Sequence, residues 1–169
     1  MKYTIESIAN ALKVDAAIVL PGCEISGVTI DHRKVNDKST LFVALKGHKV
    51  DGHVFIPELL DIGVHNFLIS DERILKDYKG QANFLLVNNM VNALQSFATH
   101  HRAKFSLPVI GITGSNGKTV VKEWLNTLLE STFRICRSPK SFNSQIGVPL
   151  SVLKLGTEHT LALLSLIHI

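Results

Sequence analysis

Hydrophobic and polar residues alternate in short runs along the chain, and the period of the alternation changes from run to run. Apolar residues at Ile5, Ile8, Ala9 and Leu12 recur at helical spacing, which predicts an amphipathic helix over 4–13. Runs rich in β-branched and aromatic residues predict strands, and longer amphipathic runs predict helices. In the first part of the chain these are strands 27–31, 40–45, 66–69 and 83–87 and helices 55–62 and 91–104.

The pattern restarts after Pro108, and we place a domain boundary between residues 105 and 106. The elements predicted beyond it are strands 108–112 and 133–136, helices 118–130 and 146–154, and a strand-like run from Thr160. Alternating strands and helices predict an α/β fold. We expect a small α/β domain over 1–105, then the start of a doubly wound parallel sheet over 106–169. Because parallel sheets are buried on both faces, three strands indicate an incomplete second domain.

A glycine-rich segment separates predicted strand 108–112 from predicted helix 118–130. It reads Thr113-Gly114-Ser115-Asn116-Gly117-Lys118-Thr119, and the order strand, glycine loop and helix is typical of a phosphate-binding loop. Its backbone N–H groups and the helix N-terminus can face phosphate oxygens, and Lys118 adds a full charge. Thr119 has its hydroxyl where a phosphate-bound magnesium ion needs a ligand. Ile112 stands where the usual first glycine would be, so the loop is a variant. The alternative is a solvated strand-to-helix turn.

Composition narrows the function classes. Of 169 residues, 46% are hydrophobic and 19% charged, which is typical of a globular protein. The net charge of +4 comes from dispersed lysines, so we expect no nucleic-acid partner. Cys23 and Cys136 lie too far apart for a zinc ribbon, and the eight histidines match no common metal motif. We find no signal peptide and no apolar run long enough to cross a bilayer, so we expect a cytoplasmic protein with no membrane partner.

Two longer stretches are more distinctive. Residues 30–35 read IDHRKV and residues 41–56 read LFVALKGHKVDGHVFI; residues 111–123 read GITGSNGKTVVKE and residues 141–150 read SFNSQIGVPL. The first pair resembles the N-terminal domain of the Mur ligase family, where D-S-R-x-V and L-F-V-A-L-x-G-x-x-x-D-G-H-x-F shape the pocket for a uridine diphosphate group. The second pair resembles the MurF branch of that family. The resemblance covers residues 1 to about 164.

The resemblance implies an ATP-dependent amide ligase of peptidoglycan synthesis that joins D-alanyl-D-alanine to UDP-N-acetylmuramoyl-tripeptide through an acyl phosphate. ATP and Mg²⁺ are the implied cofactors, and we expect a monomer. Lys118 and Thr119 are the implied catalytic residues, with Thr119 near magnesium. The implied phosphate-binding residues are Thr113, Gly114, Ser115, Asn116, Gly117, Lys118 and Thr119. The implied UDP-substrate-binding residues are Ile30, His32, Arg33, His48, Lys49 and Val50.

Further expectations concern His32, Asn143 and Asp51. His32 replaces the serine frequent in the family, although a neutral imidazole can still donate to a ribose hydroxyl. Asn143 lies in a polar turn that we expect to reach the crevice at the carboxyl ends of the strands, or else to make a local turn bond. Asp51 is expected to organise its loop. Three features on helices are expected to be structural: His100 and His101 on a polar face, Trp124 in the core, and a solvated Lys122–Glu123 pair.

The end of the chain departs from the family pattern. In the family, the strand that begins near Thr160 ends in a magnesium-binding glutamate; here Ser165 takes that position and Leu-Ile-His-Ile follows. We therefore expect a truncated piece of a ligase with a foreign end, inactive alone. Alternatives are the ligase part of a fusion with an alanine racemase, and a non-catalytic module that binds UDP-muramoyl-peptide. A P-loop kinase or GTPase is disfavoured by the stretch that resembles a uridine pocket.

Overall fold

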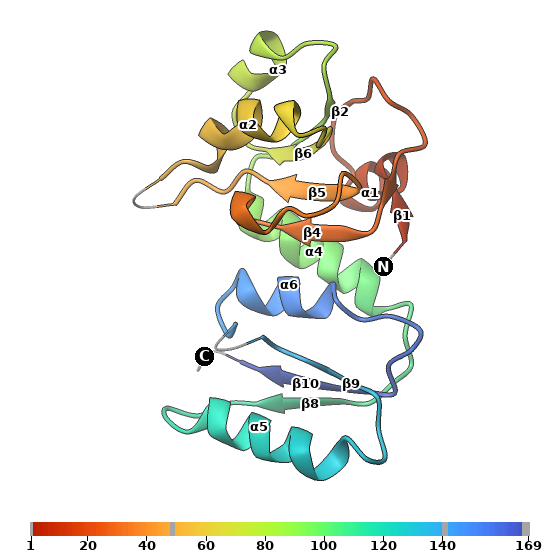
Figure 1. Cartoon of the computed structure of the whole chain (residues 1–169), viewed down its shortest axis with the longest axis vertical. Helices are drawn as coiled ribbons and strands as arrows, with labels where there is room; N and C mark the ends of the chain where they lie inside the picture. Colours follow the sequence, from red (N-terminus) through yellow and green to blue (C-terminus); the bar gives the residue numbers. More distant parts are fainter. Residues whose placement is uncertain (1, 48–49, 140–141, 167–169) are drawn as a thin grey trace. The chain divides into compact units, whose positions relative to one another are not determined.

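The computed structural model describes residues 2–47, 50–139 and 142–166. Its packing divides the chain into two compact units, Met1–Ala93 and Leu94–Ile169 (Figure 1). The division lies within helix α4 (Met90–Arg102). Each unit is described by itself, and the predicted boundary between residues 105 and 106 stays a prediction.

The first unit is built on a five-stranded sheet with the order β2-β7-β6-β5-β4. Strands β4 to β7 are parallel, whereas β2 pairs antiparallel with β7. Strands β1 and β3 form a separate antiparallel pair. The bounds are β1 Tyr3–Thr4, β2 Ala16–Ala17, β3 Glu24–Ile25, β4 Gly27–Thr29, β5 Thr40–Val43, β6 Asn66–Ile69 and β7 Asn83–Leu86.

Helices surround this sheet, and α2 and α3 lie over the same face of it (Figure 1). Their bounds are α1 Ile5–Leu12, η1 His32–Lys34, η2 Gly52–Phe55, α2 Ile56–Asp61 and α3 Arg73–Asp77. Helix α1 begins at a capping box in which the Thr4 hydroxyl accepts from the Ser7 N–H group, 3.3 Å away. The core under α2 contains Phe67 stacked on Phe84 with a centroid distance of 5.4 Å. Because helices cover the parallel strands, β5 and β6 are buried throughout.

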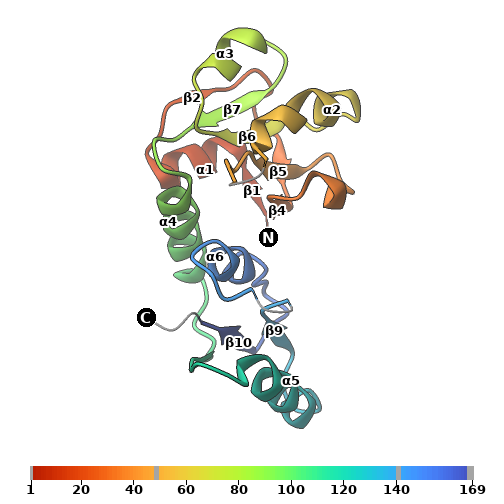
Figure 2. The same ribbon diagram turned by 90° about the vertical axis from the view of Figure 1, so that its left-hand side faces the viewer.

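The second unit contains a three-stranded parallel sheet with the order β8-β10-β9. Helix α5 lies on one face of the sheet and α6 on the other (Figures 1 and 2). The central strand β10 is buried along its whole length. The bounds are β8 Val109–Ile112, β9 Ile135–Arg137, β10 Leu161–Ser165, α5 Lys118–Leu129 and α6 Gly147–Val152.

The predicted α/β fold class is confirmed. Each strand and helix predicted from the sequence occurs, with ends that differ by a few residues. The elements that were not predicted are β1, β2, β3, α3, η1 and η2, and none of them exceeds five residues. Among the described residues, no helix is both long and apolar enough to cross a membrane.

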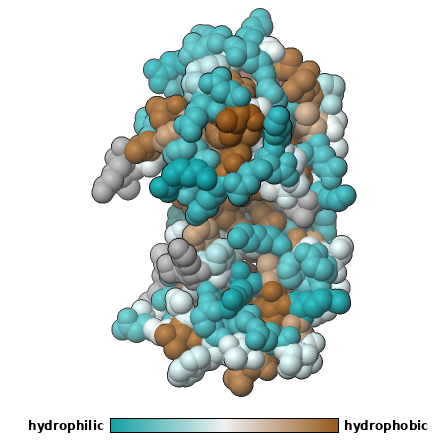
Figure 3. Space-filling view, viewed as in Figure 1, coloured by the Kyte–Doolittle hydropathy of each residue, from teal (hydrophilic) through white to brown (hydrophobic). Residues whose placement is uncertain are grey.

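The predictions for His101 and Trp124 are wrong, whereas His100 is exposed as expected. The His101 side chain is buried, and its Nε2 lies 2.9 Å from the Leu155 carbonyl oxygen. Burial lowers the pKa of His101. Trp124 is 68% exposed instead of packed in the core. Helix α5 buries Lys122 and Asn126, and Trp124 lies about 200° around the helix from Lys122. Hydrophobic residues are exposed over α5 (Figure 3), among them Val120, Val121 and Leu128.

Trp124 is the only tryptophan, so its fluorescence reports on this helix face. We expect acrylamide to quench the native protein nearly as efficiently as the urea-unfolded protein, because the indole already contacts water. Trp124→Phe should change the free energy of unfolding by no more than about 0.5 kcal/mol, as is usual for surface positions. Strong protection from quenching in the native state would contradict the exposed position.

Candidate functional site

The phosphate-binding loop predicted from the sequence connects β8 to α5. Gly114 has φ +135° and Gly117, the N-cap of α5, has φ +77°, and side chains other than hydrogen rarely allow either angle. The ammonium group of Lys118 donates a hydrogen bond to the Gly114 carbonyl oxygen. The loop therefore curls back over the first turn of α5, with the Lys118 charge against its own backbone. Thr119 is exposed beside it in this first turn.

The carboxyl ends of the strands meet beside this loop. Ile112 at the end of β8 pairs with Ser165 at the end of β10. Ser138 follows β9; it donates its N–H to the Leu163 carbonyl oxygen at 3.0 Å and accepts the Ser165 N–H on its hydroxyl at 3.2 Å. The edge of the sheet that carries the loop is thus held together by the backbone and the hydroxyl of Ser138.

The prediction of a solvated Lys122–Glu123 pair is wrong for Lys122, whereas the Glu123 side chain is 45% exposed. Lys122 is fully buried and donates to the Ser138 carbonyl oxygen at 2.6 Å, and its ammonium lies 3.2 Å from Glu123 Oε1. Glu123 also pairs with Arg137 of β9. Adjacent helical residues do not face each other, but here both side chains turn towards the end of β9. A buried charge therefore joins α5 to β9, one helical turn after Lys118.

Asn143 lines a cavity of about 550 Å³ within the second unit. Helix α4 supplies Gln95, Thr99 and Arg102 to its wall, and α6 supplies Val148 and Val152. None of the loop residues 113–119, all of which are described, lines this cavity. The turn before α6 is capped by Ser144, whose hydroxyl accepts the Gly147 N–H at 3.0 Å. A role for Asn143 in the nucleotide crevice stays a prediction.

In the first unit, four of the six predicted UDP-substrate residues are described, and His48 and Lys49 lie outside the described residues. Ile30 follows β4 and leads into η1, which contains His32 and Arg33. The His32 ring stacks on Phe55 of η2, with centroids 3.6 Å apart and an interplanar angle of 12°. This stack brings η1 and η2 together. Val50 precedes η2 in a neighbouring loop and is exposed.

That loop, residues 46–51, is closed at its base by backbone contacts. Lys46 and Asp51 form an antiparallel bridge, and the Gly52 N–H donates to the Leu45 carbonyl oxygen at 2.9 Å. A Cβ on Gly52 would lie 2.8 Å from backbone atoms of Leu45, so only glycine fits there. Asp51 caps η2, because its Oδ1 accepts the His53 N–H at 3.0 Å. This is the loop-organising role expected for Asp51.

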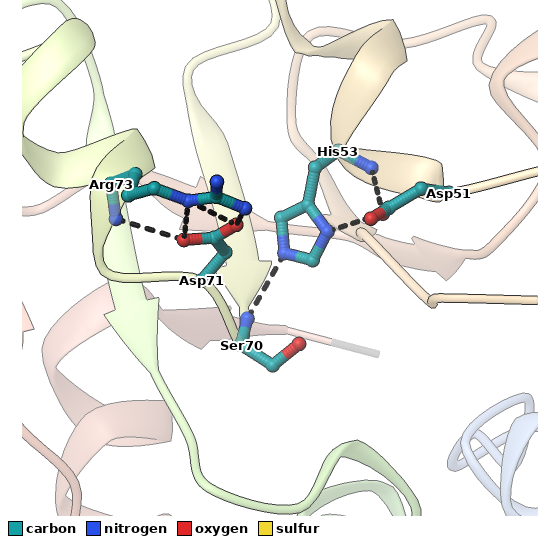
Figure 4. Close-up of polar contacts among 5 residues, drawn as sticks. All are labelled: Asp51, His53, Ser70, Asp71 and Arg73. Carbon is teal, nitrogen blue, oxygen red and sulfur yellow. Dashed lines mark hydrogen bonds and ion pairs between the residues drawn. The ribbon is translucent and has the colours of Figure 1, made fainter.

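A cluster that was not predicted lies where β6 ends. It contains Asp51, His53, Ser70, Asp71 and Arg73 (Figure 4), and all but Ser70 line a cavity of about 320 Å³. The Arg73 guanidinium bonded to Asp71 holds the pKa of that carboxyl well below its usual range. Asp71 follows a parallel strand, and the strand-end rule that we applied to the second domain would have indicated this edge as well. Among the described residues, no group of three or more His, Cys, Asp or Glu side chains is arranged to hold a metal ion.

Replacing Lys122 tests the buried charge. Lys122→Met keeps most of the buried volume but removes the donor to the Ser138 carbonyl oxygen, so we expect a loss of about 1–3 kcal/mol in the free energy of unfolding. Lys122→Ala should cost about 2–5 kcal/mol, because it also leaves a cavity. Urea denaturation measures both, with the exposed Lys154→Met as control. Equal stability of Lys122→Met and the unmodified protein would show that the ammonium contact contributes nothing.

The ion pair at η1 gives a pH prediction. Hydrogen bonds from Arg33 and Lys34 hold the pKa of Asp31 far below its usual range. A carboxyl with a lowered pKa stabilises the fold above its unfolded pKa of about 3.9, and this contribution is lost as the pH falls through the folded value. Carbon-detected NMR should show Asp31 still ionised at pH 3, and Arg33→Gln should move its titration upward. A midpoint near 3.9 in the unmodified protein would contradict the pairing.

Comparison with known proteins places both units in one family. The model "Mur ligase family, catalytic domain" matches residues 24–102, and the model "Mur ligase middle domain" matches residues 112–164. UDP-N-acetylmuramoyl-tripeptide–D-alanyl-D-alanine ligase of Bacillus subtilis is 32% identical over 98% of this chain and 36% of its own length. The enzyme of the same name from Borreliella burgdorferi is 38% identical over 79% of this chain and 31% of its own length.

Solved structures agree with these matches. A crystal structure of MurF from Acinetobacter baumannii superposes with a TM-score of 0.86 at 27% identity, over 99% of this chain and 36% of that one. MurF from Thermotoga maritima in complex with ADP gives 0.65 at 29% identity, over 83% and 32%. The chain thus spans about a third of the length of the relatives that it matches. On the two family models, which together cover most of its residues, this chain belongs to the Mur ligase family.

Proposed function

We propose that this chain supplies the UDP-substrate domain and the phosphate-binding loop of an ATP-dependent ligase that joins D-alanyl-D-alanine to UDP-N-acetylmuramoyl-tripeptide. The observation that carries the proposal is the loop between β8 and α5, with its two glycines at positive φ and Lys118 at the start of the helix. The relatives named for that reaction, and the ADP complex of a structural neighbour, support it.

The second unit has groups that can bind the phosphates of a nucleoside triphosphate. Backbone N–H groups of 113–117 face the phosphates, and Lys118 neutralises charge on the β- and γ-phosphates. The exposed hydroxyl of Thr119, in the first turn of α5, fits a magnesium ligand. Magnesium, when bound, neutralises charge that develops during phosphoryl transfer. Lys118 and Thr119 are the residues that we propose to act on the reacting phosphates.

The first unit is proposed to bind the uridine diphosphate group. Ile30, His32, Arg33 and Val50 lie on η1 and on the loop beside η2, and the sequence adds His48 and Lys49 to the same loop. The exposed Arg33 guanidinium is held by Asp31 and gives a fixed positive charge near the diphosphate. His32 is oriented by its stack on Phe55. Its ring can then donate to a ribose hydroxyl in place of serine.

The proposed reaction has two steps. A carboxylate oxygen of the tripeptide attacks the γ-phosphorus of ATP, and ADP leaves as the acyl phosphate forms. The amine of D-alanyl-D-alanine then attacks the acyl carbon, and inorganic phosphate leaves with the formation of the amide bond. Such chemistry depends on positioning and charge neutralisation. The loop residues supply this for the phosphates only, so we infer that the chain alone binds substrates but does not turn them over. We also propose a monomeric cytoplasmic protein of peptidoglycan-precursor synthesis.

Calorimetric titration tests the ATP side. We expect Mg-ADP to bind the unmodified chain and Lys118→Ala to bind it about tenfold or more weakly, because a charge-assisted hydrogen bond is lost. UDP binding should be unchanged in this variant, and Lys154→Ala serves as the control for lost positive charge. Equal binding of Mg-ADP by Lys118→Ala would overturn the assignment of Lys118. Binding of UDP without any binding of Mg-ADP would instead favour the non-catalytic module.

A further inference from the structure

We propose that His53 is a positioning residue: its ring holds Asp51, at the base of the loop between β5 and η2, against the end of β6, and so positions that base for the UDP group. The proposal rests on the proposed function, since it concerns the same substrate loop. The His53 ring acts through Asp51, which it contacts directly.

The His53 side chain is only 6% exposed and uses both ring nitrogens (Figure 4). Nδ1 lies 2.6 Å from Asp51 Oδ1, and Nε2 lies 3.1 Å from the Ser70 backbone nitrogen. A backbone N–H can only donate, so Nε2 must be the acceptor and carries no proton. The ring proton is therefore on Nδ1 and is donated to the Asp51 carboxylate. The two contacts fix one tautomer and one orientation of the ring.

This ring connects two segments that are distant in sequence. Ser70 directly follows β6, whose Phe67 is part of the buried core, so the end of this strand is a rigid anchor. Asp51 closes the base of the loop through its bridge to Lys46. It also accepts two donors from His53, the backbone N–H and the ring. The position of Asp51, at the base of the loop, thus follows from the core through Ser70 and His53.

The same short helix also positions the other proposed contact. His53 and Phe55 both belong to η2, and Phe55 stacks on His32. A displacement of η2 would therefore disturb His32 and Asp51 together. Gly52 leaves no room for compensation, because its backbone lies against that of Leu45. Helix η2 therefore positions two proposed parts of the UDP site, His32 through Phe55 and Asp51 through His53.

Charged groups of both signs lie around the ring. Asp51 and Asp71 carry negative charge, the Arg73 guanidinium is bonded to Asp71, and the charge of Lys46 acts on Asp51 from the base of the loop. Burial raises the pKa of Asp51, but the hydrogen bonds from His53 outweigh burial and leave that pKa below its usual value. The carboxylate therefore stays ionised as an acceptor for the ring.

Two substitutions separate the two contacts. His53→Asn keeps an amide donor near Nδ1 for Asp51, and His53→Gln keeps an acceptor near Nε2 for Ser70. The full chain is titrated with UDP as probe and, separately, with Mg-ADP. Hydrogen exchange reports on the amides of Gly47, Gly52 and Ser70, two of which close the loop. Arg73→Gln is the matched control, because it removes a charge from the same cavity without touching either His53 contact.

Each His53 variant should bind UDP about tenfold more weakly, as expected when a hydrogen bond to a charged or buried group is lost. The loop amides should exchange at least tenfold faster, while Mg-ADP affinity stays unchanged. Arg73→Gln should behave like the unmodified protein. The proposal is overturned if both His53 variants retain UDP affinity and slow exchange, or if they lose Mg-ADP binding and unfold at lower urea concentration, since that would show a general structural role.

The outcome also separates this inference from the proposed function. If the unmodified chain binds no UDP, the proposed function of the first unit fails. The exchange rates of Gly47 and Gly52 then still decide whether His53 holds the loop, because they need no ligand. Slow exchange of these amides in all variants would overturn the inference whatever the UDP titration shows.

Discussion

Parallel strand pairing is the constraint on which the rest of the structure depends. In a parallel sheet all carboxyl ends lie at one edge, so the segments that follow the strands meet there. In the first unit this rule brings together η1 after β4, loop 46–51 after β5 and Ser70 after β6. In the second unit it brings the loop after β8 beside the ends of β9 and β10. The candidate site residues of each unit follow from that arrangement.

Buried polar side chains then attach these segments to the strand ends. Lys122 reaches the carbonyl group of Ser138, and His53 reaches the N–H group of Ser70. Backbone groups just beyond a strand have left the ladder of the sheet and need other partners where water is excluded. A buried side chain that supplies the partner fixes the position of its own segment as well. Each unit has one such contact at a strand end, made by Lys122 in the second unit and by His53 in the first.

The sequence predicted those parts of the fold that depend on local chemistry. The glycine turn between β8 and α5 was predictable because Gly114 and Gly117 take backbone angles that favour glycine, and α1 because Thr4 and the apolar spacing agree. Strands β1 to β3 are two residues long, too short for a period to show. Helix α3 likewise has only five residues.

The exposed Trp124 on α5 and the contacts of His53 were not predicted, for other reasons. Val120, Val121, Trp124 and Leu128 form an apolar stripe that is typical of a buried face, yet α5 buries Lys122 and Asn126 instead. A prediction from periodicity assumes that the apolar face of a helix packs against the sheet. In α5 the buried face instead carries Lys122 and Asn126. The role proposed for His53 depends on Ser70, 17 residues away, and no local pattern contains that contact.

The bond between Lys118 and the Gly114 carbonyl oxygen has a consequence for the freedom of the side chain. An ammonium group has three N–H donors, so this bond leaves two of them open while it holds the long side chain over the loop. A lysine that is already held in one position loses less conformational entropy when its remaining donors are used.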